Sequence, residues 1–247
     1  MSALLEVRDI RKAYGAIRAV DGVSFAVEPG EILGVIGPNG SGKTTMFNAI
    51  LGQVKPDAGQ VLFEGADVSG IGALALSRRG IGRTFQSLQV FTGLSVRDNL
   101  IAAGQEFAGS AASRLFARPD AGMGRRAEEI IALFRIGHVA HLAAGSLSYG
   151  QQKLVDIAMA FMARPRLVLL DEPCAGVNPA LIDELMDLLR RLNREQGASF
   201  IIIEHNMDFV MRLCSRVICL ATGSILAEGA PAAVQANRAV LEAYLGV

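Results

Sequence analysis

One segment of the sequence combines glycine, lysine and threonine residues at a spacing suited to holding a phosphate group. It matches the pattern GxxxxGK[ST] and reads Gly37-Pro38-Asn39-Gly40-Ser41-Gly42-Lys43-Thr44-Thr45. Glycines let successive backbone N–H groups converge on phosphate oxygens, and the start of a following helix adds a favourable partial charge. Lys43 would reach the β- and γ-phosphates, and the Thr44 hydroxyl would bind Mg²⁺. The segment therefore predicts a site for a nucleoside triphosphate.

Two carboxylates end an apolar run later in the chain, in Leu167-Val168-Leu169-Leu170-Asp171-Glu172-Pro173. In nucleotide hydrolases an aspartate at a strand end holds the metal ion, and an adjacent glutamate can deprotonate the attacking water. Taken alone, such a pair is more often a solvated strand end. Because a phosphate loop stands in the same chain, the pair instead indicates a metal ligand at Asp171 and a general base at Glu172.

These groups need a sheet to position them, and the sequence predicts one. The phosphate loop follows an apolar run at 31–36 and precedes a helical pattern at about 42–51. Short apolar runs then alternate with helical patterns, which is typical of an α/β fold with a mostly parallel sheet. Further strands are predicted at 23–27, 61–63, 81–85, 168–170, 199–203, 218–220 and 224–227, and further helices at 125–134, 151–162 and 179–194. The small, polar stretch at 102–124 is predicted to be a loose connection.

The composition limits the class of protein. The chain has 247 residues, 51% of them hydrophobic, and its 24 basic residues balance 24 acidic ones. This excludes a mainly disordered chain and argues against a nucleic-acid binder that acts through bulk charge. The apolar runs are too short to span a membrane, and the first residues lack the pattern of a signal peptide. Three cysteines without CxxC spacing fit reduced thiols, so we expect a soluble, cytoplasmic chain.

A third motif stands between the first two, and shorter ones accompany it. Leu147-Ser148-Tyr149-Gly150-Gln151-Gln152 is similar to the LSGGQ signature of ABC-transporter ATPases. Gln86 in RTFQ falls at that family's Q-loop glutamine, and His205 in IIIEHN falls at its switch histidine. Tyr14 in KAYG matches the aromatic residue that stacks on adenine, and AGVNP at 175–179 matches the D-loop. The chain therefore resembles this family from about residue 4 to residue 245.

The resemblance implies a P-loop ABC ATPase fold of the α/β class, with a RecA-like core sheet, an antiparallel β subdomain and an α-helical subdomain. One domain would span residues 1–247, with a nucleotide-binding core at about 1–86 and 160–247 and a helical signature subdomain at about 87–159. The resemblance also implies ATP and Mg²⁺ as ligands. Residues with a catalytic role would be Lys43, Gln86, Glu172 and His205, and the metal contacts would be Thr44, Gln86 and Asp171.

In this family ATP lies between two subunits, so each subunit alone holds half a site. The phosphate loop of one subunit would face Ser148, Gly150 and Gln151 of the other, which would contact the γ-phosphate. The expected partners are therefore a second ATPase subunit, in a homodimer or a heterodimer, and transmembrane permease subunits, with a periplasmic substrate-binding protein involved indirectly. The expected place is the cytoplasmic face of the inner membrane, as a peripheral protein.

Departures from the commonest pattern point to a subfamily. The signature has Tyr149 in place of its first glycine, and the D-loop reads GVNP instead of SALD. Together with RTFQ, LSYGQQ, IIIEHNMDFVM and the terminal EAYLG, these features resemble the longer ATP-binding subunit of branched-chain amino acid transporters. That resemblance implies an importer for branched-chain or other hydrophobic amino acids. Cys174 has no explanation at this level.

Several of these residues also have structural interpretations. Ser148 is a favoured helix N-cap, which is compatible with a role at the γ-phosphate. A lone histidine after an apolar strand, such as His205, is more often structural, and only the resemblance favours catalysis. Val90, Phe91 and Leu94 could fill the core of their own loop, but a hydrophobic socket for a helix of a membrane partner is favoured.

Other functions remain as alternatives. The nearest are the ATPase of a urea or amide importer and that of the lipopolysaccharide-export type, whose D-loop also reads AGV. A soluble ABC ATPase of DNA repair or translation is disfavoured, because such proteins carry coiled coils or two nucleotide domains in one chain. A regulatory module without turnover is disfavoured by the presence of Glu172 and His205.

Overall fold

The strands of the protein form two sheets. The computed structural model describes residues 3–84, 88–104 and 121–245. The larger sheet has the order β10-β9-β3-β8-β7-β6, with strands Ser224–Gly229, Arg216–Ala221, Ile32–Ile36, Ser199–Ile203, Leu167–Asp171 and Ile81–Arg83. All of its pairs are parallel except that of β10 with β9. The smaller sheet is antiparallel, in the order β2-β1-β4-β5, with strands Ile17–Val27, Leu5–Tyr14, Ala58–Phe63 and Ala66–Asp67.

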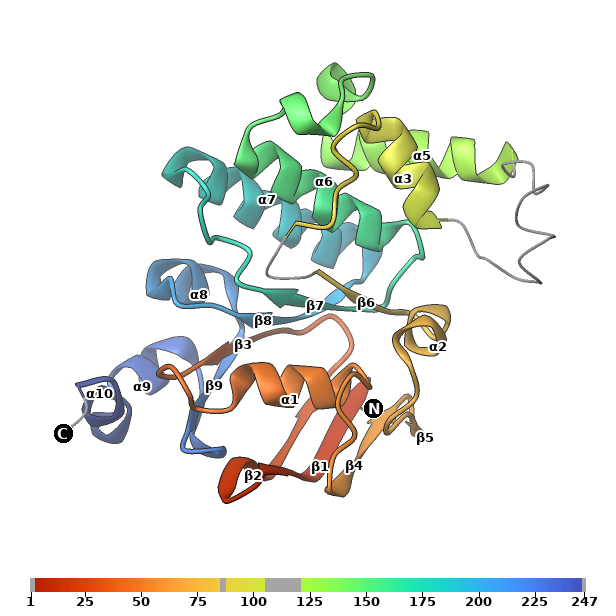
Figure 1. Ribbon diagram of the computed structural model, residues 1–247. Coiled ribbons are helices and arrows are strands. Elements are labelled where there is room, and N and C mark those ends of the chain that lie inside the picture. The colour runs from red at the N-terminus through yellow and green to blue at the C-terminus, as the bar shows by residue number, and fades with distance from the viewer. Residues whose placement is uncertain (1–2, 85–87, 105–120, 246–247) are drawn as a thin grey trace.

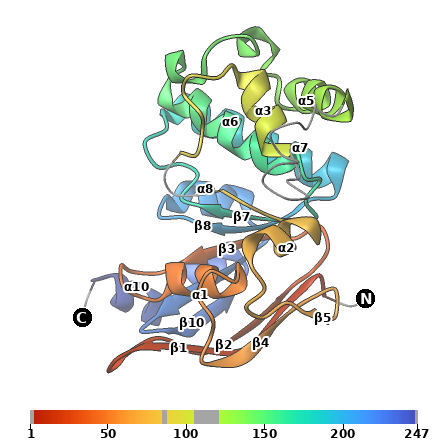
Figure 2. The same ribbon diagram turned by 45° about the vertical axis from the view of Figure 1, so that its right-hand side comes forward.

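The helices occupy both faces of the larger sheet (Figures 1 and 2). Helix α1 (Lys43–Ile50) lies between the two sheets, and a helical layer, together with α8 (Met207–Leu213), covers the opposite face. The members of that layer are α3 (Val96–Gly104), α5 (Ala121–Phe134), α6 (Tyr149–Phe161) and α7 (Pro179–Gln196). The shorter helices are α2 (Ala73–Arg78), α8 (Met207–Leu213), α9 (Pro231–Gln235) and α10 (Arg238–Leu245), and 3-10 turns stand at Gly137–Val139 and Ala144–Ser146.

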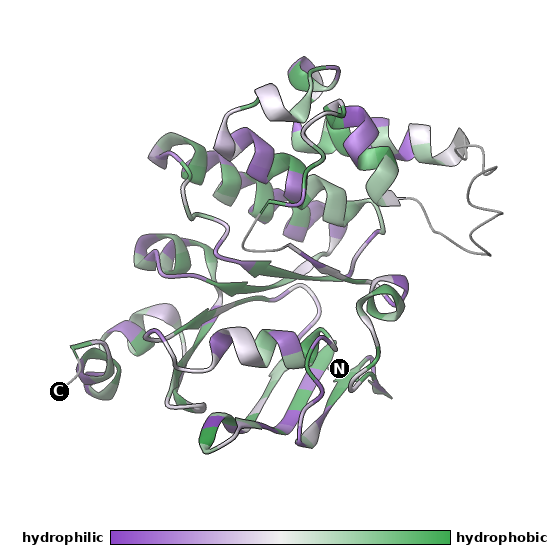
Figure 3. Ribbon diagram, viewed as in Figure 1, coloured by the Kyte–Doolittle hydropathy of each residue, from purple (hydrophilic) through white to green (hydrophobic). Residues whose placement is uncertain are grey.

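Burial on both faces explains the continuous apolar strands of the larger sheet. Strands β3, β7 and β8 are buried at every position, and Figure 3 shows them as mainly hydrophobic. Leu33 and Val35 pack toward α1 and the antiparallel sheet, whereas Ile32 and Ile36 pack toward the helical layer. The period-2 alternation of side chains along β3 therefore joins the two hydrophobic cores.

The structure confirms most predicted elements, corrects one expectation and adds elements that the sequence did not indicate. The strand at 199–203 and the hairpin at β9 and β10 are present, and α1 begins at Lys43 directly after the phosphate loop. Strand β1 was not predicted from the sequence. The connection expected at 102–124 is helical at both ends, because α3 continues to Gly104 and α5 begins at Ala121.

Among the described residues, no helix is both long enough and apolar enough to cross a membrane.

Candidate nucleotide-binding site

The phosphate loop joins β3 to α1, and two of its glycines are required by close contacts. Gly37 has a φ of +146°, and a Cβ at this position would lie 2.2 Å from the Leu220 carbonyl oxygen. Gly42 has a φ of +101°, and a Cβ there would lie 2.1 Å from the carbonyl oxygen of Ala19. Any side chain would therefore force the loop away from its neighbours.

Lys43 closes the loop on itself. Its Nζ donates hydrogen bonds to the carbonyl oxygens of Gly37, at 2.7 Å, and Pro38, at 3.0 Å. The side chain is buried, and this burial lowers the pKa of the ammonium group, while the carboxylate of Glu172 opposes the shift. The ammonium therefore lies on the inner side of the loop, where a phosphate would meet it.

A cavity of about 610 Å³ opens in front of this loop. It is lined by loop residues Asn39 to Thr45, by Ile17, Arg18 and Ala19 of β2, and by Glu172, His205 and Thr222. A Cβ built on Gly40 would meet nothing within 4 Å, so the loop backbone is open toward the cavity. Backbone N–H groups, a lysine and the start of α1 converge there, which fits the polyphosphate of a nucleotide.

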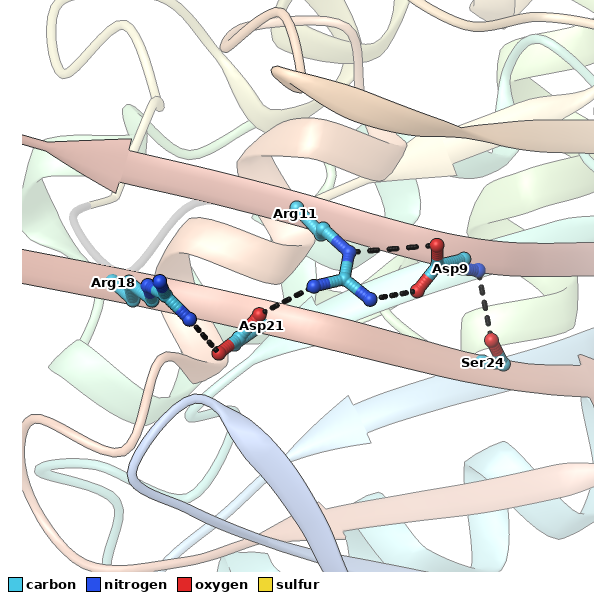
Figure 4. A network of polar contacts seen from close by, with 5 residues as sticks. All are labelled: Asp9, Arg11, Arg18, Asp21 and Ser24. Atoms are coloured by element: carbon cyan, nitrogen blue, oxygen red, sulfur yellow. Dashed lines mark hydrogen bonds and ion pairs between the residues drawn. The ribbon is translucent and has the colours of Figure 1, made fainter.

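The hairpin of β1 and β2 forms one wall of the cavity and carries a chain of ion pairs (Figure 4). Arg18 Nη1 lies 3.1 Å from Asp21 Oδ2, and Arg11 bridges Asp21, at 2.9 Å, to Asp9, also at 2.9 Å. The backbone N–H of Asp9 donates to Ser24 Oγ at 2.7 Å. Because these pairs are exposed, each contributes little to the stability of the fold.

Tyr14 ends β1 opposite Ile17, the first residue of β2 and a part of the cavity wall. Its ring is half exposed, and Lys12 Nζ lies 5.6 Å from the ring centroid. Tyr14 is not among the described residues that line the cavity, although Ile17, its partner in β2, does line it. The structure thus places Tyr14 at the rim, on the side of β2.

Glu172 and His205 meet at the carboxyl ends of two neighbouring strands, β7 and β8. His205 Nε2 lies 3.0 Å from Glu172 Oε1, and both residues line the cavity. Glu172 has a φ of +48°, which is uncommon for a residue other than glycine and can store strain at an active site. The strained turn directs the carboxylate toward the phosphate loop.

Glu204 holds both chain segments from beneath. Its buried carboxylate accepts hydrogen bonds from the backbone N–H groups of Cys174, at 2.7 Å, His205, at 2.8 Å, and Asn206, at 2.9 Å. One side chain therefore positions the residues that follow β7 and those that follow β8. The sequence could have indicated this role of Glu204, because a carboxylate directly follows an apolar strand and precedes His205.

The predicted metal ligands supply oxygen atoms, the donor type that Mg²⁺ prefers. Asp171 is buried at the end of β7, and its burial raises the pKa of the carboxyl group, while the Arg83 guanidinium opposes this shift. Thr44 lies at the start of α1 and lines the cavity. The predicted ligand Gln86 lies outside the described residues.

Ser148, Gly150 and Gln151 stand apart from this cavity, at the start of α6. Ser148 is the N-cap: its Oγ accepts from Gln151 N at 3.4 Å, and its own N–H donates to Gln151 Oε1 at 3.0 Å. The expected capping role is therefore confirmed. None of these three residues is among the described residues that line the cavity.

The unusual Tyr149 of the signature packs against the segment after β7. A Cβ on Gly176, which has a φ of +70°, would lie 3.0 Å from Tyr149 Cε1. Similarly, a Cβ on Gly150 would lie 2.5 Å from Leu181 Cδ1 in the first turn of α7. Gly176 is thus required by its backbone conformation, whereas a side chain at position 150 would make Leu181 shift.

The fold and this cavity define a P-loop nucleotide-binding domain, and the sequence comparisons give its family. The sequence pattern of the ABC transporter family matches residues 20–175, more than half of the chain. The chain belongs to the ABC transporter family and is an ATP-binding subunit with ATPase activity. A second pattern, that of the branched-chain amino acid ATP-binding cassette transporter, matches residues 224–247.

Two curated relatives match over nearly their whole length. The high-affinity branched-chain amino acid transport ATP-binding protein BraF of Pseudomonas aeruginosa is 34% identical over 249 residues, covering 98% of both chains. The lipopolysaccharide export system ATP-binding protein LptB of Escherichia coli is 37% identical over 244 residues, covering 99% of this chain and 98% of LptB.

Two solved structures are similar in fold. The ADP conformation of MJ1267, an ATP-binding cassette of an ABC transporter, superimposes with a TM-score of 0.90 at 34% identity, covering 100% of both chains. The dimeric post-hydrolysis state of the cassette MJ0796, bound to ADP and Pi, gives a TM-score of 0.75 at 25% identity, covering 92% of this chain and 98% of that one. The predicted fold class is confirmed.

Proposed function

We propose that this protein hydrolyses ATP to power an importer of branched-chain or other hydrophobic amino acids. The observation that carries the catalytic part is the single cavity in which the phosphate loop faces Glu172 and His205. The substrate class is supported by the branched-chain pattern at residues 224–247 and by the similarity to BraF. The similarity to LptB is of the same order, so lipopolysaccharide export is the second candidate.

The triphosphate is held by the loop from Gly37 to Thr45, with Lys43 at the β- and γ-phosphates. Thr44, Asp171 and Gln86 would hold Mg²⁺, which when bound would neutralise charge on the phosphate oxygens. Tyr14 stacks on the adenine at the rim.

Hydrolysis requires a base and a group that stabilises charge. Glu172 accepts the proton of the attacking water, and the Glu172 carboxylate is already directed into the cavity by its left-handed backbone conformation. His205, 3.0 Å from that carboxylate, orients the carboxylate and donates toward the γ-phosphate, while Lys43 balances the developing charge. By its resemblance to the Q-loop glutamine, Gln86 would contact the metal and the water and connect them to the helical subdomain.

A second ATPase subunit completes the site. Ser148, Gly150 and Gln151 lie away from the cavity of their own subunit and cap the γ-phosphate bound by the partner. The dimeric structure of MJ0796 supports this arrangement, which suits a homodimer or a heterodimer. Residues at about 87–159 form the helical signature subdomain, which moves against the nucleotide-binding core at about 1–86 and 160–247 as the dimer closes.

The permease subunits contact the loop at 90–95, at the cytoplasmic face of the inner membrane. Phe91 and Leu94 expose their side chains, at 56% and 41%, while the buried Asn99 holds the loop from beneath. Asn99 accepts from Phe91 N at 2.7 Å and donates to the carbonyl oxygens of Phe91, Leu94 and Ser95. The apolar side chains are thus presented on a rigid loop, which suits a permease helix. The periplasmic binding protein acts indirectly, through the permease.

Transport assays distinguish the candidate substrates. The protein is co-purified with its permease subunits and reconstituted in vesicles with a candidate binding protein, and uptake of labelled leucine and urea is measured with ATP. Leucine uptake that is lost in Glu172→Gln supports the proposal. Urea uptake alone, or release of lipopolysaccharide from the vesicles without amino acid uptake, would contradict the substrate class while leaving the ATPase assignment intact.

A further inference from the structure

A hydrogen bond joins the last helix to the first glycine of the phosphate loop. The backbone N–H of Gly37 donates to the hydroxyl of Tyr244 at 2.8 Å, across 207 positions of sequence. On the other side of the same residue, Lys43 Nζ donates to the Gly37 carbonyl oxygen at 2.7 Å. Gly37 is therefore held at its N–H by α10 and at its C=O by the lysine that faces the cavity.

Helix α10 is anchored to the core by Val240, and its own local contacts hold its helical form. Val240 is buried, Ala239 N donates to the Asn237 side chain at 2.9 Å, and Arg238 pairs with Glu242 at 2.7 Å. The Tyr244 hydroxyl is the part of the side chain that reaches inward, and burial raises the pKa of the phenol. The phenol therefore stays protonated at neutral pH, and its oxygen accepts the Gly37 N–H while its own O–H remains available as a donor.

The surroundings of Gly37 leave its peptide little freedom. A Cβ at this position would lie 2.2 Å from the Leu220 carbonyl oxygen and 2.8 Å from Ser41 Oγ. The loop is thus confined by β9, by its own serine and by Tyr244, and the contact with Tyr244 is a hydrogen bond to the Gly37 N–H that is removed by deleting a single oxygen atom. Tyr244 has no role in the ATP hydrolysis proposed above.

We propose that Tyr244 is a positioning residue for the nucleotide, which fixes the Gly37 peptide in the orientation that Lys43 and the following N–H groups need to meet the phosphates. The inference rests on the proposed nucleotide site. Because coupling between two sites is reciprocal, bound nucleotide also stabilises α10 against local opening. The C-terminal segment that carries the branched-chain pattern is thereby linked to nucleotide binding.

The variant Tyr244→Phe removes the hydroxyl and keeps the ring. The loss of one hydrogen bond from a backbone N–H corresponds to a change of about three- to tenfold in nucleotide affinity. We expect the Kd for a fluorescent ADP analogue and the KM for ATP to rise by that factor, with kcat unchanged. The matched control is Leu241→Ala, a change on the same helix at a side chain that is exposed; it should leave both constants as in the wild type.

Two further measurements separate positioning from general stability. Hydrogen exchange of peptides covering α10 should slow when ADP is added to the wild type, and this protection should be lost in Tyr244→Phe. In a Lys43→Ala background, Tyr244→Phe should weaken ADP binding less than it does in the wild type, since both act on Gly37. The inference would be overturned if wild type and Tyr244→Phe bound ADP with equal Kd values. It would also be overturned if Tyr244→Phe and Leu241→Ala lost kcat and nucleotide affinity to the same extent. A wild-type protein that binds no ADP would instead contradict the proposed function.

Discussion

His205 Nε2 lies 3.0 Å from Glu172 Oε1, so the ends of β7 and β8 are joined in front of the phosphate loop. The two residues are adjacent because their strands are neighbours in a parallel sheet, whose carboxyl ends meet at one edge. Glu204 fixes both turns through three backbone N–H groups, so neither residue depends on the other for its place. Each can therefore be changed with limited effect on the fold.

Glu172→Gln should separate binding from hydrolysis. The amide has the size of the carboxylate but cannot accept a proton from water, so we expect ATP binding to persist and turnover to fall by about 10²- to 10⁴-fold. Phosphate release at saturating ATP and the Kd for a fluorescent ATP analogue measure the two effects. With ATP and Mg²⁺ the variant should also elute as a stable dimer.

Glu195→Gln is the matched control, because Glu195 is exposed near the end of α7. It should hydrolyse ATP at the wild-type rate. Normal turnover in Glu172→Gln would remove Glu172 from its role as the base.

His205→Ala tests the partner of this carboxylate. Loss of a group that orients the base and stabilises the transferring phosphoryl should lower kcat by about 10²-fold, with little change in nucleotide Kd. The control is His141→Ala, at an exposed histidine outside the cavity. If the two variants hydrolysed ATP equally well, His205 would be a structural residue.

The sequence identified the phosphate loop and the carboxylates because each is a local pattern at the end of an apolar run. Strand β1 was missed because register shifts on either side of Ile10, beside the left-handed Asp9, interrupt the alternation that marks a strand. The contact of Tyr244 with Gly37 joins segments 207 positions apart, and no local pattern carries such information. No local pattern indicates that Lys153 of α6 is buried, either; this burial is the chief cause that lowers the pKa of its ammonium group.

Lys43→Ala should weaken binding itself. The lysine is the buried cation of the loop and also bonds the carbonyl oxygens of Gly37 and Pro38, so its loss removes both charge and loop order. We expect the Kd for an ATP analogue to rise at least about tenfold. Lys55→Ala changes an exposed lysine and should bind as the wild type does. An unchanged Kd in Lys43→Ala would show that the phosphate assignment is wrong.

The three cysteines should react slowly with thiol reagents while the protein is folded. All are buried; burial raises the pKa of Cys174 and Cys219, and it raises the pKa of Cys214 to about 12 from 9.0. Because the thiolate is the reactive form, colour development with a disulfide reagent at pH 8 should be slow until denaturant is added. Folding raises the pKa of the Cys214 thiol, so keeping this thiol protonated contributes to the free energy of unfolding. The contribution is complete below pH 9.0 and is lost as the pH rises toward 12. Rapid reaction of any thiol in the native protein would contradict this burial.

Ser148 has a capping role that the structure shows and a role at the partner's γ-phosphate that is proposed, and two variants separate them. Ser148→Ala removes both and should lower the free energy of unfolding by about 1 kcal/mol. Ser148→Asn keeps an N-cap, so its stability should equal that of the wild type, yet the longer amide displaces the hydroxyl from the γ-phosphate. We expect both variants to lose ATPase activity while binding ADP normally, because the phosphate loop of their own subunit is intact. In mixed dimers with Lys43→Ala, a Ser148→Asn subunit leaves one site that combines both defects and one that is intact, so activity should partly return. Wild-type ATPase activity in Ser148→Asn would confine Ser148 to capping α6.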